Sequence, residues 1–321
     1  MIRSTLSDFG GPEVLRVETA PDPLPAAREI AIEVHAAGVN RADLLQRAGH
    51  YPPPPGAPSW PGLEVAGAVT EVGDGVTRWS PGDRVCALLA GGGYATRVAV
   101  HEDLVLPVPA GLSWQEAGGL VEAACTAWSN LEAADARAGE TLLVEGGSGG
   151  VGHLAVQLGV ALGMRVLATA RGAERAARVA ALGAETIDYA AGDVAARVRE
   201  LGGADVILDV LGAAALDDHL RMLKPDGRLV VIGMQRGRHG DLDLGRLLST
   251  RARVIGTTLR ARPHTQKARI VREVEEQVWP HVPERIRPLV HATYPLDRAA
   301  DAHRALDSGE VFGKVVLTPP A

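Results

Sequence analysis

The sequence predicts an α/β protein in which a mostly-β domain precedes a domain built on a doubly wound parallel sheet. Short alternating apolar segments, broken by glycine and proline, fill about the first 115 residues. From about residue 120, six strand candidates alternate with helical stretches, the pattern of a parallel sheet. A glycine-rich turn at 147–152 joins the first of these strands to an amphipathic helix.

In the first region, strand candidates occupy 29–34, 67–72, 84–88 and 94–100, and Ser80-Pro81-Gly82-Asp83 is a turn signal between two of them. Residues 51–61 contain six prolines, which lack the amide donors that a helix or central strand needs. We therefore expect a stiff loop there, acting either as a connector or as the wall of a binding cleft.

The second region repeats a strand-helix unit. Its strand candidates fall at 141–145, 165–169, 185–187, 205–209, 228–232 and 253–257. The chain after Leu259 holds helix candidates near 264–279 and 298–308 and an apolar strand at 314–317. This tail exceeds what a nucleotide-binding domain needs, so we expect it to return to the first domain.

The turn between residues 147 and 152 predicts the chemistry of the second region. Gly147-x-Gly149-x-x-Gly152 follows an apolar strand and opens a helix with one apolar face. Glycines at these positions let the backbone turn sharply and approach a pyrophosphate, whose charge then lies at the helix N-terminus. Because the motif has its strand and its helix, we interpret it as a dinucleotide-binding fingerprint.

The end of the next strand indicates which dinucleotide is bound. A ribose-binding acid is expected there, but the strand ends in Ala170-Arg171-Gly172, and Arg175 follows one turn later. Arginine offers paired donors to a 2′-phosphate, which a carboxylate would repel. The alternative is that both arginines are solvated surface charges. The missing acid favours NADP(H).

Composition excludes several classes of function. The formal net charge of −6 argues against nucleic-acid binding. The first residues lack the apolar core of a signal peptide, and no apolar run reaches membrane-spanning length. Cys86 and Cys125 have no CxxC partner, so neither a disulfide framework nor a cysteine zinc site is expected. We expect a soluble, cytoplasmic protein.

Several motifs in order resemble one family. They are Ala37–Asp43, Pro61–Gly67, Pro81–Val85, Thr126–Ala127, Gly147–Gly152 and Ile187–Tyr189. On these the chain resembles the medium-chain dehydrogenase/reductases, and specifically the zinc-independent quinone oxidoreductases. The segments NRADLLQR, TLRARP and AHRAL…GKVVL are similar to the tumour-suppressor-inducible NADPH quinone oxidoreductase branch. The resemblance implies a GroES-like catalytic domain over 1–118, a Rossmann NADP(H)-binding domain over 119–259, and residues 260–321 returning to the catalytic domain.

The zinc alcohol dehydrogenases of that superfamily differ from this chain at their metal ligands. Their ligand positions fall at Asn40, Leu63 and Glu122, so that only Glu64 remains of the constellation. One carboxylate cannot hold a zinc ion that needs three protein ligands. The ten histidines form no HxxxH pair, and we expect each to be a surface or core residue. The expectation is therefore no metal and hydride transfer to an electron-poor acceptor.

The resemblance assigns roles to individual residues. Asn40 and Tyr51 are the predicted catalytic residues, with Asn40 beside the nicotinamide and ribose. Tyr51 would donate a hydrogen bond to the acceptor oxygen, or else only cap its loop. The predicted cofactor-binding residues are Asn40, Thr126, Gly147, Gly149, Gly150, Val151, Arg171, Arg175, Tyr189, Gly233, Met234 and Lys314.

Among these, Gly149, Gly150 and Val151 would present backbone to the pyrophosphate, and Tyr189 would pack on the phosphate side of the adenosine. Gly233 and Met234 would flank the nicotinamide, with Thr126 near it. Lys314 would reach a cofactor phosphate, unless it is an ordinary charge at a strand end. Glu64 is expected in a buried network, with Arg41 as its candidate partner, and Cys125 has no base to activate it.

The predicted function is an NADPH-dependent quinone oxidoreductase acting on a small quinone or enone. A 2-enoyl or alkenal (enone) reductase is the first alternative, which the sequence does not separate from it. The second is an NADPH-binding protein of low turnover with a regulatory or RNA-binding role. The apolar edge strand around Val254–Thr258 predicts a homodimer joined through its edges.

Overall fold

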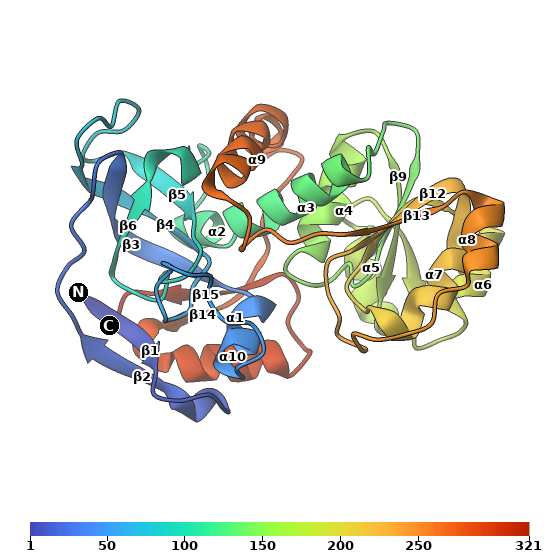
Figure 1. Cartoon of the computed structure of the whole chain (residues 1–321), viewed down its shortest axis with the longest axis horizontal. Coiled ribbons are helices and arrows are strands. Elements are labelled where there is room, and N and C mark those ends of the chain that lie inside the picture. The colour runs from blue at the N-terminus through green and yellow to red at the C-terminus, as the bar shows by residue number, and fades with distance from the viewer. Residues whose placement is uncertain (321) are drawn as a thin grey trace. The chain divides into compact units, whose positions relative to one another are not determined.

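The structure is a computed structural model that describes residues 1–320 (Figure 1). The described chain divides into two compact units. One comprises Met1–Cys125 together with the chain from Arg260 onward, and the other is Thr126–Leu259. The C-terminal segment therefore belongs with the N-terminal region. Residues 119–125 also belong to the first unit, although the motif pattern assigned them to the nucleotide-binding region.

The first unit is built on a seven-stranded sheet in the order β14-β15-β3-β4-β5-β7, with β6 paired to β3. Its strands are β3 (Glu29–Val39), β4 (Glu64–Val72), β5 (Arg84–Leu88), β6 (Arg97–His101), β7 (Val105–Pro107), β14 (Val290–Pro295) and β15 (Lys314–Thr318). A separate antiparallel hairpin joins β1 (Ile2–Leu6) to β2 (Leu15–Thr19). The central strand β3 has antiparallel neighbours on both sides, β15 and β4.

Four α-helices accompany this sheet: α1 (Arg41–Arg47), α2 (Trp114–Gly118), α9 (His264–Gln277) and α10 (Ala299–Asp307). The pattern predicted α9 and α10 but not α1, which lies in a region expected to be all-β. The start of α1 is fixed locally, because the Asn40 amide donates to the Asp43 carboxylate over 2.8 Å. Short 3-10 helices of this unit are η1 (Pro12–Val14), η2 (Glu102–Leu104), η4 (Trp279–His281) and η5 (Leu296–Arg298), and η3 (Ala213–Ala215) lies in the second unit.

The second unit holds a six-stranded sheet in the order β10-β9-β8-β11-β12-β13, and every pair is parallel. The strands are β8 (Thr141–Val144), β9 (Arg165–Ala170), β10 (Glu185–Asp188), β11 (Ala204–Asp209), β12 (Leu223–Val231) and β13 (Arg253–Gly256). The helices are α3 (Val121–Ala133, in this unit from Thr126), α4 (Gly152–Ala161), α5 (Ala173–Ala180), α6 (Val194–Glu200), α7 (Leu216–Met222) and α8 (Leu244–Thr250).

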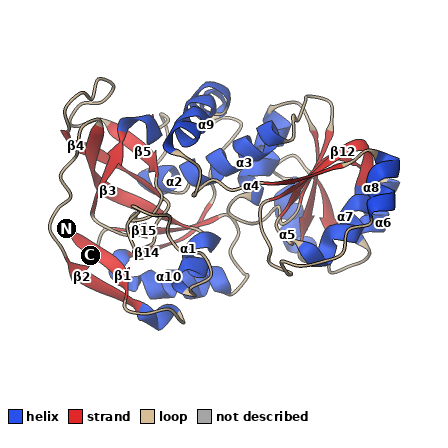
Figure 2. Cartoon of the chain, in the orientation of Figure 1, coloured by secondary structure: helices blue, strands red, loops and turns tan. Residues whose placement is uncertain are grey.

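The predicted doubly wound sheet is confirmed, with a strand at each of the six predicted places. Figure 2 shows its strands in red among blue helices. Its central strands are buried because both faces are covered, and Leu143, Leu167 and Ile207 lie in the core. The strand order reverses between β8 and β11, and such a reversal opens a binding site at the carboxyl ends of the strands. In the described part of the chain, no helix combines the length and apolarity needed to span a membrane.

Candidate functional site

A buried ion pair lies at one end of the first unit's sheet. The Lys314 ammonium donates to Glu64 Oε1 over 2.6 Å and to Asn40 Oδ1 over 2.5 Å, and Asn40 Nδ2 donates to Glu64 Oε1 over 3.0 Å. Strand register brings the three together. Val315 lies opposite Val39, which places Lys314 beside Asn40, and Ala37 lies opposite Val65, the neighbour of Glu64. We call Asn40, Glu64 and Lys314 the buried triad.

Further hydrogen bonds hold the triad in place. Glu64 Oε2 accepts the Glu122 amide over 3.0 Å. The Asp43 carboxylate accepts the Asn40 amide over 2.8 Å and the Gly62 amide over 2.9 Å. Burial raises the pKa of Asp43 to about 6, although these amide donors oppose the shift. A side chain at Gly38 would overlap Glu64 Oε1, so the close approach of strand and carboxylate requires glycine there.

Glu64 lies in a buried network as expected, but the cation that pairs with Glu64 is Lys314 and not Arg41. Arg41 lies on α1 and pairs with Asp307 over 3.0 Å at the surface. The side chains of Lys314 and Glu64 are each only 1% exposed. Lys314 is therefore not an ordinary solvated charge at a strand end, because its ammonium is buried and bonds Glu64 and Asn40. Its contact with a cofactor phosphate stays a prediction.

Tyr51 is held by Arg260, a residue for which the sequence motifs predicted no role. The Arg260 guanidinium lies 5.3 Å from the centre of the Tyr51 ring, and its Nη1 donates to the Tyr51 carbonyl over 3.3 Å. It also donates to Gln46 Oε1 and to the Ala90 carbonyl, both over 2.7 Å. Residues 51–61 form no helix or strand, as their prolines predict. Arg260 belongs to the TLRARP segment, and this motif is the sequence feature that could have identified it as a site residue.

In the second unit, the glycine turn connects β8 to α4. The Gly146 amide donates to Thr169 Oγ1 and the Gly147 amide to the Thr169 carbonyl, both over 2.9 Å. The Gly149 amide bonds the Gly146 carbonyl within the turn. A Cβ atom on Gly147 would lie 2.9 Å from Ala168 Cβ, and one on Gly152 would overlap the Gly146 carbonyl oxygen. Glycine is therefore required for close packing at both positions.

A buried polar network is connected to this turn through Thr169. Glu145 Oε2 accepts the Thr169 hydroxyl over 2.7 Å, and its Oε1 lies 3.3 Å from His219 Nε2. His219 Nδ1 lies 3.7 Å from Asp209 Oδ2, at the end of β11. Burial raises the pKa of Asp209. No sequence motif predicts this network, because its members come from four separate segments of the chain.

The residues predicted to bind the 2′-phosphate on the adenosine ribose lie just after β9. Arg171 follows β9 and is exposed, and Arg175 lies on α5. One carboxylate, that of Asp188 at the end of β10, lies close to the end of β9. It accepts the Gly172 amide over 2.8 Å and the Ala190 amide over 2.9 Å. Its oxygen Oδ1 is thereby bound to backbone. Tyr189, the next residue, is 43% exposed.

The remaining predicted cofactor residues follow other strand ends. The Gly233 amide, just after β12, donates to the Asp209 carbonyl over 3.2 Å, and Met234 is 59% exposed. Because the sheet is parallel, the turn at 147–152, Arg171, Tyr189 and Met234 all follow carboxyl ends of strands. Thr126 lies on α3, where its carbonyl accepts Asn130 Nδ2 over 2.7 Å. Their contacts with a cofactor stay predictions.

Neither cysteine has the environment of a nucleophile. Burial raises the pKa of both thiols, Cys86 and Cys125, so the reactive thiolate is disfavoured.

The edge strand β13 is only partly covered: Val254 is 41% exposed, and Leu244 and Leu248 on α8 are 61% and 77% exposed. The homodimer stays a prediction.

Comparisons with known proteins place the chain in a family. Residues 26–110 match the alcohol dehydrogenase GroES-like domain, and residues 150–276 match the zinc-binding dehydrogenase family. The chain is 33% identical to the quinone oxidoreductase of Mus musculus, over 97% of this chain and 95% of the relative.

Solved structures agree with this assignment. The quinone oxidoreductase from Thermus thermophilus, described with its NADPH complex, has a TM-score of 0.86 and 36% identity, over 99% of this chain and 100% of that one. A structure described as an NAD-dependent alcohol dehydrogenase has a TM-score of 0.86 and 30% identity, over 99% of both chains. The protein therefore belongs to the medium-chain dehydrogenase/reductase superfamily.

Proposed function

We propose that this oxidoreductase transfers a hydride from NADPH to a quinone and that it does so without zinc. The buried triad is the observation that carries the proposal. At the positions where zinc dehydrogenases of the superfamily hold their metal, this chain has Asn40, Leu63 and Glu122. The one retained acid, Glu64, is neutralised by the Lys314 ammonium at 2.6 Å. A dication would have to displace this cation and would gain no imidazole or thiolate in exchange.

The chemistry of the acceptor follows from this arrangement. Dehydrogenating an alcohol calls for a Lewis acid to stabilise the developing alkoxide, and the triad offers no site for one. A quinone is already electron-poor, so it needs positioning beside the hydride donor more than acid catalysis. The relative from Mus musculus is a quinone oxidoreductase by name, in line with this acceptor class. We assign Asn40 to positioning the nicotinamide and ribose, and the Tyr51 hydroxyl to a hydrogen bond with the acceptor oxygen.

Two observations favour NADPH as the cofactor. The relative from Thermus thermophilus is described as a complex with NADPH, and the glycine turn of this chain has the strand, the close packing and the helix of a dinucleotide site. When bound, NADPH supplies the hydride. This chain would contribute the amides of Gly150 and Val151 at the start of α4 and the side chain of Arg171.

A screen of electron acceptors tests the quinone assignment. NADPH oxidation by the purified protein is followed with ortho- and para-quinones, enones and enoyl thioesters. We expect the highest kcat/KM with quinones, because they accept hydride without metal or strong general-acid assistance. Turnover of enoyl thioesters but not of quinones would replace the proposal with an enoyl reductase. Cofactor binding with no turnover of any acceptor would favour a regulatory NADPH-binding protein.

The cofactor preference is tested at Arg171. Replacing Arg171 with alanine should weaken NADPH binding by about tenfold or more and leave NADH binding nearly unchanged, because only NADPH carries the 2′-phosphate. Fluorescence titration of both cofactors measures this. Arg197→Ala, which removes an exposed arginine of α6 that pairs with Glu200, is the matched control and should change neither affinity. Wild-type protein that binds NADH as tightly as NADPH would refute the preference.

A further inference from the structure

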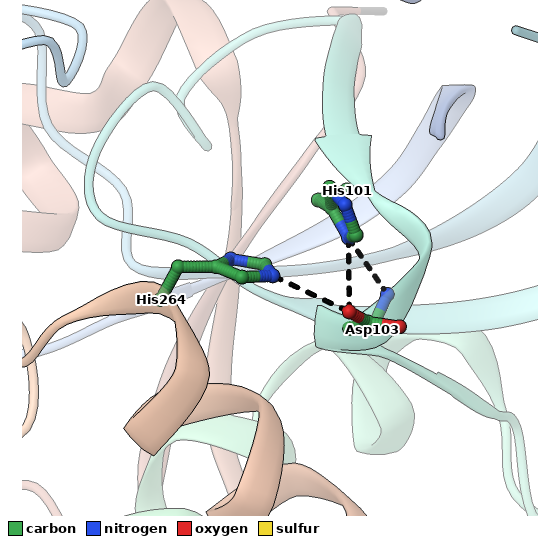
Figure 3. Close-up of side chains that lie close together, drawn as sticks. All are labelled: His101, Asp103 and His264. Carbon is green, nitrogen blue, oxygen red and sulfur yellow. Dashed lines mark hydrogen bonds and ion pairs between the residues drawn. The ribbon is translucent and has the colours of Figure 1, made fainter. Parts of the chain in front are cut away.

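Two histidines and an aspartate from distant parts of the chain meet on the surface of the first unit. His101 ends β6, Asp103 lies in η2, and His264 is the first residue of α9. Figure 3 shows both imidazoles directed toward the Asp103 carboxylate. Asp103 Oδ2 lies 3.4 Å from His101 Nδ1 and 3.4 Å from His264 Nε2. None of the three residues has a role that the sequence motifs predict.

These distances match the spacing of ligands around a tetrahedral metal. Bonds of about 2.0–2.1 Å to a zinc ion place its ligand atoms about 3.3–3.4 Å apart. Two of the three pairs in this cluster already have that separation, and all three donor atoms lie within 4.8 Å of one another. The third pair, the two imidazole nitrogens, lies within 4.8 Å, so a shift of one ring would complete the spacing. The His264 side chain is 42% exposed, so it has room to adjust.

The charges around the cluster also favour a cation. Arg28 contacts the cluster, and its guanidinium lies 2.9 Å from Glu102 Oε1 and 3.3 Å from Asp103 Oδ1. Two carboxylates therefore face one guanidinium, which leaves a net negative charge when the imidazoles are neutral. Arg28 contacts the Oδ1 atom of Asp103, whereas Oδ2 faces the histidines. A metal ion at Oδ2 would leave the Arg28 contact intact.

The protonation state needed for binding is partly set in advance. The Asp103 amide donates to His101 Nδ1 over 3.2 Å, so this nitrogen is unprotonated, and a metal ion would take its lone pair in place of this hydrogen bond. Neutral imidazole nitrogens with one carboxylate oxygen are ligands that suit zinc and its first-row neighbours. Because the side chains are partly exposed, water can complete the coordination.

We propose that His101, Asp103 and His264 form a binding site for a divalent transition metal of the zinc class. The site would join the end of β6 to the start of α9, two segments that are far apart in the sequence. It is separate from the buried triad and has no part in hydride transfer. A metal there would act as a structural cross-link, which stabilises the folded state because the unfolded chain does not hold the ligands together.

Isothermal titration of chelator-treated, full-length protein with zinc chloride tests the proposal. We expect one zinc ion per chain and a rise in Tm when zinc is added. His264→Ala and Asp103→Asn should each weaken binding by at least about tenfold and abolish the rise in Tm. His239→Ala, which removes an exposed histidine of the second unit, is the matched control and should bind as the wild type does.

Cobalt(II) offers a second readout, because tetrahedral coordination gives it visible absorption bands that the His264→Ala variant should lack. The absence of saturable zinc binding would overturn the proposal. Equal zinc affinity in wild type, His264→Ala and Asp103→Asn would also overturn it, because the metal would then lie elsewhere. NADPH oxidation by His264→Ala should match the wild type, so this proposal can fail without affecting the proposed function.

Discussion

Replacing Lys314 with methionine should lower the free energy of unfolding of the first unit by about 3–5 kcal/mol, because it leaves the Glu64 carboxylate charged and buried without its cation. Methionine keeps most of the length and apolar volume of the lysine stem, so the expected loss comes from the charge and not from a cavity. Denaturant unfolding followed by tryptophan fluorescence measures it. Four of the five tryptophans lie in the first unit: Trp60, Trp79, Trp114 and Trp279.

Two further variants separate the buried charge from other causes. Lys224→Met removes a lysine from a partly exposed pair with Asp205, and it should cost about 1 kcal/mol or less. Combining Lys314→Met with Glu64→Gln removes both charges and should recover part of the loss, because glutamine keeps an acceptor for the Glu122 amide. A Lys314→Met variant as stable as the wild type would contradict the account of the triad.

Replacing Gly152 with alanine should abolish measurable binding of NADPH. The added Cβ would overlap the carbonyl oxygen of Gly146 and would also lie 2.9 Å from its carbonyl carbon. Backbone atoms cannot move aside as a side chain does, so the turn between β8 and α4 must open. The amides at the start of α4 would then lose the arrangement that a pyrophosphate needs. The strain itself is expected to cost about 1–3 kcal/mol of stability.

Gly192→Ala is the matched control for this substitution, because a Cβ there meets no atom within 4 Å. It should leave cofactor affinity and stability close to those of the wild type. Fluorescence titration with NADPH compares the two variants, and circular dichroism checks that both are folded. If a folded Gly152→Ala variant bound NADPH with wild-type affinity, the turn would not be the pyrophosphate site.

The sequence predicted the second unit more completely than the first. Most strands of the parallel sheet contain a short apolar run and alternate with helices, and this local pattern predicted a strand at all six places. In the first unit the pattern missed α1, a seven-residue helix too short to show a helical period. The candidate strand 29–34 continues to Val39. Within that extension β3 pairs with β4 at Ala36 and Ala37 and with β15, from the other end of the chain, at Ala37 to Val39.

The candidate site also depends on contacts between distant segments, which local sequence patterns do not predict. The resemblance pointed to Asn40 and Lys314 separately, but their contact depends on the register of β15 against β3, which no local pattern encodes. Arg41 is the only cation next to Asn40 in sequence, yet it lies on the exposed face of α1 and pairs with Asp307. His101 and His264 likewise approach one carboxylate only after the C-terminal segment has packed on the first unit. Long-range pairing, and not residue type, was the missing information.

The rate of NADPH oxidation with a quinone, measured after chelator treatment and dialysis, tests whether hydride transfer by this protein needs a metal ion. We predict that the metal-depleted enzyme keeps its full kcat and that added zinc does not raise it, because Lys314 neutralises Glu64 and no imidazole or thiolate stands at Asn40, Leu63 or Glu122. The same measurement on His264→Ala excludes an effect of the surface cluster. Activity lost on chelation and restored by zinc in both proteins would contradict the account.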